Sequence, residues 1–137
     1  MANLSKSKYI TYCQCPKALW LKQYKPEEMV IDPLTQARFD AGTEVGELAK
    51  RLFGDFVEAT TYKTAADETQ RLDLGAMAAA TQKALAEGAE NIAEAAFIYD
   101  GCYCAVDLLH KTPHGYAIYE VKSSTDLKEL EVYAQDV

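Results

Sequence analysis

The chain has 137 residues, of which 49% are hydrophobic and 26% charged, a composition that is typical of one folded domain and excludes a disordered chain. No apolar run is long enough to cross a bilayer, and the N-terminal segment lacks the apolar stretch of a secretory signal. We therefore expect a cytoplasmic protein with no membrane partner. The four cysteines are too few for a disulfide scaffold and are expected to stay as thiols: Cys13, Cys15, Cys102 and Cys104.

The formal net charge of −7 argues against a nucleic-acid partner, because phosphate binding relies on Lys and Arg. The charge is unevenly spread, however, since residues 1–25 contain no acidic residue and carry +5, which leaves −12 for the rest. The lysines of this basic segment are candidate DNA contacts: Lys6, Lys8, Lys17 and Lys22, with Lys25 at its end. A lysine-rich, solvated helix surface is the alternative interpretation.

Capping residues and the spacing of apolar residues predict four helices, at residues 6–12, 16–24, 34–53 and 74–86. Ser5 is a suitable N-cap for the first helix, and Pro16 suits the first turn of the second. Gly54 and Gly88 follow the ends of the third and fourth. The aromatic residues of the first two helices either stack on single-stranded DNA or build a core between these helices and a sheet: Tyr9, Tyr12, Trp20 and Tyr24.

From Asn91 onward the apolar residues alternate with period two, which predicts strands at residues 91–100, 103–110 and 115–123, after a short strand at 56–59. The tight-turn pair Asp100-Gly101 and a looser connection at 111–114 make an antiparallel three-stranded meander. A helical pattern starts at Asp126 and continues to Val137. We therefore expect a single α+β (αβ) domain over residues 1–137, with N-terminal helices packed on the meander and the C-terminal part of the fold truncated.

Three polar residues on neighbouring strands form the candidate catalytic group. Alternation places Glu120 and Lys122 on one face of their strand. With the connection at 111–114, Asp107 is expected opposite Ile118, on the same face as Glu120. Two carboxylates on one face repel each other unless a divalent cation neutralises them, and Mg²⁺ favours one or two carboxylates with water and phosphate. A solvated Glu120–Lys122 pair beside a separately satisfied Asp107 is the alternative.

Asp107, followed by Glu120-Val121-Lys122, resembles the signature of PD-(D/E)XK nucleases, the RecB-family and CRISPR-associated exonucleases. The chain is also similar to a bacterial family of uncharacterised proteins that have an N-terminal nuclease domain of this type. The matching segments are residues 4–8, 14–21, 42–49, 94–97 and 120–125. The resemblance implies a restriction-endonuclease-like core, Mg²⁺- or Mn²⁺-dependent exonuclease action on DNA ends, and metal ligation by Asp107, Glu120 and the backbone carbonyl of Val121. It gives Lys122 the role of the catalytic cation.

Other positions depart from the family or match it more loosely. Where such enzymes often have a metal-binding His on the helix before the sheet, this chain has Gly46 and then Glu47, which could replace it as a ligand or be solvated. Glu94 matches an acidic position of these families whose side chain would contact the metal ligands rather than the metal itself. Cys15 matches one ligand of an iron–sulfur cluster, but the three later cysteines of related enzymes are absent, so no cluster is expected in this fragment. The family's Gln on the following helix could be Gln135.

Two rival functions remain open. The chain could keep the nuclease fold as a catalytically silent DNA-binding or scaffolding module. It could instead be a metal or redox protein that uses its four cysteines, although Cys-x-Cys spacing is less typical of zinc sites than a longer gap. An exposed sheet edge would also allow a homodimer, and the C-terminal remainder of the protein is a further expected partner.

Overall fold

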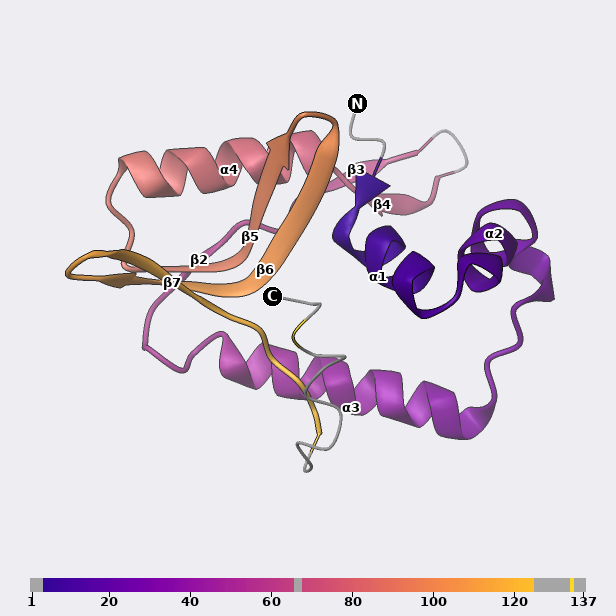
Figure 1. Cartoon of the computed structure of the whole chain (residues 1–137). Coiled ribbons are helices and arrows are strands. Elements are labelled where there is room, and N and C mark those ends of the chain that lie inside the picture. Colours follow the sequence, from indigo (N-terminus) through magenta and orange to yellow (C-terminus); the bar gives the residue numbers. More distant parts are fainter. Residues whose placement is uncertain (1–3, 66–67, 125–133, 135–137) are drawn as a thin grey trace.

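A mixed five-stranded sheet lies between helices in the computed structural model, which describes residues 4–65, 68–124 and 134 (Figure 1). The helices are α1 (Lys6–Gln14), α2 (Pro16–Tyr24), the short 3-10 helix η1 (Pro26–Glu28), α3 (Pro33–Ala49) and α4 (Leu74–Ala86). The strands are β1 (Leu4–Ser5), β2 (Val57–Glu58), β3 (Tyr62–Thr64), β4 (Gln70–Leu72), β5 (Asn91–Tyr99), β6 (Cys102–Thr112) and β7 (Gly115–Tyr119). The expectation of a mixed α and β fold is confirmed.

Short polar side chains start the helices, as the sequence predicts for α1. The Ser5 side chain accepts a hydrogen bond from the Lys8 backbone N–H (3.2 Å), and the Asp73 carboxylate accepts one from Ala76 in the same way (3.1 Å). The fourth helix has the predicted bounds. The third ends at Ala49 rather than at 53, because the chain continues in tighter turns and then reverses at Gly54, whose φ is +93°.

Strand β6 is the centre of the larger sheet. It pairs antiparallel with β5 along its length and antiparallel with β7 at its far end, which confirms the meander. The hairpin turn at Asp100 and Gly101 has positive φ at both residues, as a tight turn of this type requires. The short strand predicted at 56–59 occurs as β2, which pairs parallel with β5, whereas β1, which pairs parallel with β6, was not predicted. The small hairpin of β3 and β4 was not predicted either.

The expected register between β6 and β7 was wrong by two residues. Ile118 lies opposite Leu109, not opposite Asp107. The reason is that the ladder continues to the pair Thr112 and Gly115, so that only two residues remain in the turn. A shift by an even number of residues leaves every side chain on its expected face. Continued by the same register, the pairing places position 120 opposite Asp107.

The hydrophobic core lies between α4 and the β5–β6 hairpin, with α4 along one face of the sheet and α3 on the opposite side (Figure 1). Its side chains include Met77, Ala84, Ile92 and Leu109, which are at most 4% exposed. Thr81 is fully buried there; its hydroxyl donates to the Met77 carbonyl (3.0 Å) and accepts from the Ala96 N–H (2.8 Å). Both hydrogen-bonding capacities of this polar group are therefore used.

The prediction that the N-terminal helices form a core with the meander was wrong. α4 is the helix packed on the sheet, whereas α1, α2 and α3 contain no buried residue. The four aromatic residues proposed for that core are all more than half exposed: Tyr9, Tyr12, Trp20 and Tyr24. Trp20 and Tyr24, one helical turn apart, pack on each other instead, with ring centroids 5.5 Å apart.

Among the described residues, no helix combines the length and apolarity that a bilayer crossing requires. The edges of the sheet are β1, β2 and β7, of which the first two have only two residues each. Short edge strands offer few unpaired backbone groups for a homodimer, and β7 is the longest edge available. The helix expected from Asp126 and the Gln135 position lie outside the described residues.

Candidate active site

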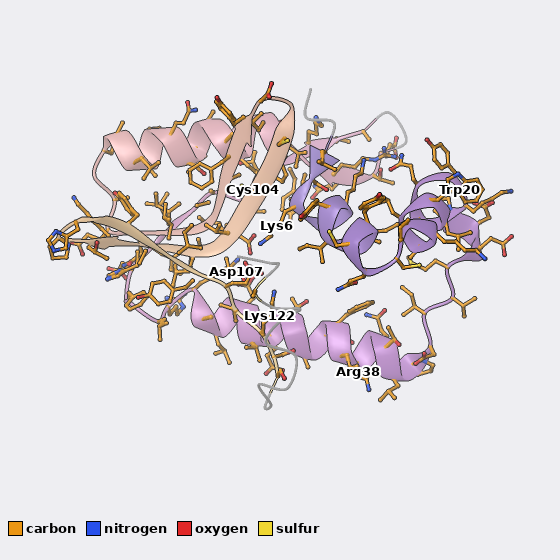
Figure 2. The ribbon with its side chains drawn as sticks, in the orientation of Figure 1. Lys6, Trp20, Arg38, Cys104, Asp107 and Lys122 are labelled. Atoms are coloured by element: carbon orange, nitrogen blue, oxygen red, sulfur yellow. The ribbon has the colours of Figure 1, made fainter. Side chains whose placement is uncertain are left out.

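Strand β6 brings together the central residues of the candidate site. β6 carries Asp107, pairs near its start with β1, which leads into Lys6, and pairs near its end with β7, which leads into Glu120. Lys6, Asp107 and Lys122 consequently lie in the middle of the molecule, between the sheet, α1 and α3 (Figure 2). Segments from the two ends of the chain meet there through pairing with the same strand.

Asp107 holds the segment that follows β7. Its Oδ2 accepts a hydrogen bond of 2.6 Å from the Val121 backbone N–H. This bond continues the contact between β6 and the Glu120–Lys122 segment beyond the last backbone pair, Leu108 with Tyr119. The sequence prediction that Asp107 and the Glu-x-Lys segment share one neighbourhood agrees with this contact. The structure assigns the Val121 N–H a partner, while the expected role of its carbonyl stays a prediction.

The carboxylate of Glu120 lies between two ammonium groups. Its Oε1 is 2.6 Å from Lys122 Nζ, and its Oε2 is 2.9 Å from Lys6 Nζ. The Glu120 side chain is only 11% exposed. A carboxylate that is so little hydrated needs compensating charge, and the two lysines supply it. Asp107 and Glu120 are thus placed by neighbouring strands but bound by different partners.

A polar hollow of about 370 Å³ opens between the sheet and α3, and we call it the Asp107 hollow. Asp107, Val121 and Glu94 line it from the sheet side; Phe39, Gly42, Thr43, Gly46 and Glu47 line it from α3. Gly42 and Gly46 are one helical turn apart and so share a helix face. A Cβ added at Gly46 would meet no atom within 4 Å, whereas one added at Gly42 would lie 3.7 Å from Ser123 Oγ, so this face of α3 is open at Gly46 and covered at Gly42.

Glu94 stands in β5 at the position opposite Asp107, between the pairs Ala93–Leu108 and Ala95–Val106. Its φ is +54°, which is unusual for a residue other than glycine and destabilises the backbone by about 1–3 kcal/mol. Burial, and then the nearby charge of Asp107, raise the pKa of Glu94. The structure therefore places Glu94 on the Asp107 hollow itself, closer to Asp107 than the sequence indicated.

Lys50 joins the carboxylates on the α3 side. Its Nζ is 2.8 Å from both Glu47 Oε1 and Glu58 Oε2, and its side chain is 12% exposed. Burial lowers the pKa of Lys50, but the hydrogen bonds to Glu47 and Glu58 outweigh this effect and raise it. Glu47 is thereby engaged by a lysine. A second hollow of about 600 Å³ includes Lys6, Lys50, Glu47, Glu58 and Glu94 in its lining, so Glu47 and Glu94 border both hollows.

The donor atoms fit a hard divalent cation, because Mg²⁺ and Mn²⁺ prefer carboxylate oxygens and require only one or two of them from the protein. In the described part of the chain, however, no three His, Cys, Asp or Glu side chains are grouped so that they could hold a metal ion. The carboxylate oxygens of Asp107 and Glu120 are thus of the kind that such an ion prefers. In this structure, however, Asp107 accepts a hydrogen bond from Val121, and Glu120 accepts hydrogen bonds from Lys6 and Lys122.

The remaining predicted positions are spread over the N-terminal helices and the hairpin. Among the lysines proposed as DNA contacts, Lys8 is on α1, and Lys17 and Lys22 are at exposed positions of α2. Lys6 is the one that contacts Glu120. The cysteines are free thiols; Cys13, Cys15 and Cys102 are exposed, and Cys104 is partly buried.

Sequence reasoning missed two cations of this site. The position of Lys6 depends on pairing between β1 and β6, and a two-residue strand has no periodic signal. The ion pair between Glu47 and Lys50 could have been predicted, because the two residues have the i, i+3 spacing of a helical ion pair.

Comparison of this chain with models of protein families, with curated proteins and with solved structures finds no match in any of the three. What the site does must therefore be argued from its own residues.

Proposed function

We propose that this chain is the catalytic core of a metal-dependent DNA nuclease that hydrolyses phosphodiester bonds at DNA ends. The observation that carries the proposal is the hydrogen bond from the Val121 N–H to Asp107, which holds the Glu-x-Lys segment against β6 just beyond the last β6–β7 pair, Leu108 with Tyr119. An acid on β6, the Glu-x-Lys segment that follows β7, and two further carboxylates that line the Asp107 hollow, Glu94 beside Asp107 and Glu47 on α3, form a set suited to phosphoryl chemistry.

Each residue has a distinct task in this proposal. Asp107 and Glu120 would hold Mg²⁺ or Mn²⁺, with the Val121 carbonyl as a further oxygen donor. The bound ion would polarise a phosphoryl oxygen and lower the pKa of a water molecule. Lys122 would orient that water or stabilise the charge that develops on the phosphate. Glu94, from β5, would contribute a further carboxyl group to the lining of the hollow, where burial and the charge of Asp107 raise its pKa.

The test is cleavage of linear single- and double-stranded DNA in the presence of Mn²⁺, with the longest natural form of the protein. Asp107→Asn, Glu120→Gln and Lys122→Met should each lower the rate at least about 100-fold, because each removes a charge from the reacting centre. Asp100→Asn is the matched control: it makes the same chemical change in the hairpin turn, where Asn tolerates the positive φ of +46° equally well. Activity that survives the site substitutions would refute the proposal.

A second candidate function is a silent DNA-binding module with the same architecture. The observation in its favour is that both central carboxylates already have protein partners. Calorimetric titration with Mn²⁺ separates the two candidates, because a silent module that has lost its metal site would show no heat of binding, whereas a nuclease would bind Mn²⁺ even without DNA.

A further inference from the structure

The two lysines on Glu120 come from opposite ends of the chain. Lys122 is two residues away from Glu120 and reaches it within the same extended segment, whereas Lys6 is 114 residues away. The Lys122 contact is thus local. The Lys6 contact exists only because the tertiary structure brings α1 beside the end of β7.

The backbone of Lys6 is fixed from both sides. Before it, Leu4 and Ser5 pair with Cys102 and Tyr103 of β6, and the Leu4 N–H donates to the Gly101 carbonyl (3.3 Å). After it, the Ser5 cap starts α1. The ammonium group is therefore delivered to Glu120 from a position that β6 itself defines, the same strand that carries Asp107.

The pair is well shielded from water. The Lys6 and Glu120 side chains are 26% and 11% exposed, so their attraction is screened less than that of a surface ion pair. An ammonium group and a divalent cation on the same carboxylate repel each other, because both are positively charged. An ion that binds at Glu120 therefore competes with Lys6 and Lys122 for the negative charge of Glu120, and this competition couples the two equilibria.

We propose that Lys6 is a positioning residue that neutralises Glu120 in the metal-free protein and releases its Oε2 when a divalent cation binds. This inference rests on the proposed metal site and adds a regulatory element to it: metal binding loosens the contact between α1 and the site. Lys6 is preferred over Lys122 as the group released because Lys6 belongs to a helix with no buried residue, whereas Lys122 is held close to Glu120 by the chain itself.

Calorimetric titration of the full chain with Mn²⁺ tests the inference without relying on catalysis. Lys6→Met removes the competitor and should tighten Mn²⁺ binding about fivefold, the effect of a partly shielded ion pair. Lys6→Arg should weaken binding, because a guanidinium holds a carboxylate with two parallel hydrogen bonds. Lys8→Met, also on α1, is the matched control for loss of one positive charge and should change the affinity less than twofold.

Hydrogen exchange of the α1 backbone amides gives a second measurement. Addition of Mn²⁺ should speed exchange in α1 of the wild-type protein and have little effect in Lys6→Met, where the contact is already lost. Equal affinities in Lys6→Met and Lys8→Met, or weaker binding in Lys6→Met, would overturn the role of Lys6 and leave the metal site intact. No Mn²⁺ binding in any variant, wild type included, would overturn the metal site and this inference together.

Discussion

The two halves of this molecule use hydrophobic residues differently. In the region of α4, β5 and β6, large apolar side chains are enclosed, as Ile92 and Leu108 are, at 0% and 1% exposure. In α3, apolar residues recur at helical spacing as well, but Leu48 and Phe39 are 70% and 55% exposed. The difference teaches that helical periodicity predicts a helix reliably and does not by itself predict what the helix packs against.

The candidate site lies where these two halves meet. Asp107 and Glu94 come from the strands of the enclosed core, whereas Glu47 and Lys6 come from helices without buried residues, and Lys50 follows the end of one of them. Groups held by close packing keep their positions, and groups on exposed helices rely on ion pairs to do so.

The largest expected effect tests the contrast directly. Ile92→Ala should lower the free energy of unfolding by about 2–5 kcal/mol, because it leaves a cavity in a closely packed core. Leu48→Ala removes a similar volume from α3. It should change the free energy of unfolding by less than about 0.5 kcal/mol, because the Leu48 side chain is 70% exposed. Urea unfolding of both variants gives the two values. Equal losses would show that Leu48 is covered in solution.

A smaller effect is expected at Gly46. Gly46→Ala should stabilise α3 by about 0.5–1 kcal/mol, because alanine favours the helix and its Cβ meets no atom within 4 Å. Gly54→Ala should destabilise the protein instead, since the φ of +93° at Gly54 is unfavourable for alanine. Slower hydrogen exchange in the α3 amides would confirm the first effect, and a clash at Gly46 would appear as faster exchange.

The smallest effect concerns Glu94 and depends on pH. Its folded-state pKa is raised above the ordinary value of 4.5, so folding favours the protonated form. The stability that the Glu94 carboxyl group contributes is therefore fully present below pH 4.5. It is lost as the pH rises through the raised pKa of this group. Glu94→Gln lacks this loss, so its Tm relative to wild type should increase from pH 4 to pH 7, to an extent set by the size of the pKa shift. Glu90→Gln, at an exposed position, is the isosteric control; a difference that does not vary with pH would contradict the assignment.

The sequence alone determined the local features, because each depends on residues close together in the chain. Helix 74–86 follows from an apolar period and a glycine beyond its end, and the hairpin follows from Asp100-Gly101. The antiparallel pairing of the strand that carries Asp107 with the strand that precedes Glu120 was also predicted, and a register error of two residues leaves the side chains of the paired residues on their predicted faces.

Only the tertiary structure decided which distant side chain contacts the Glu120 carboxylate. Lys6 reaches Glu120 through a two-residue strand that pairs across nearly the whole chain, and no local pattern records such a pairing. The exposure of α3 and the backbone of Glu94 were equally beyond the sequence, because both depend on what the rest of the chain places beside them. Long-range pairing of short segments is stabilised by the assembled sheet rather than by their own residues.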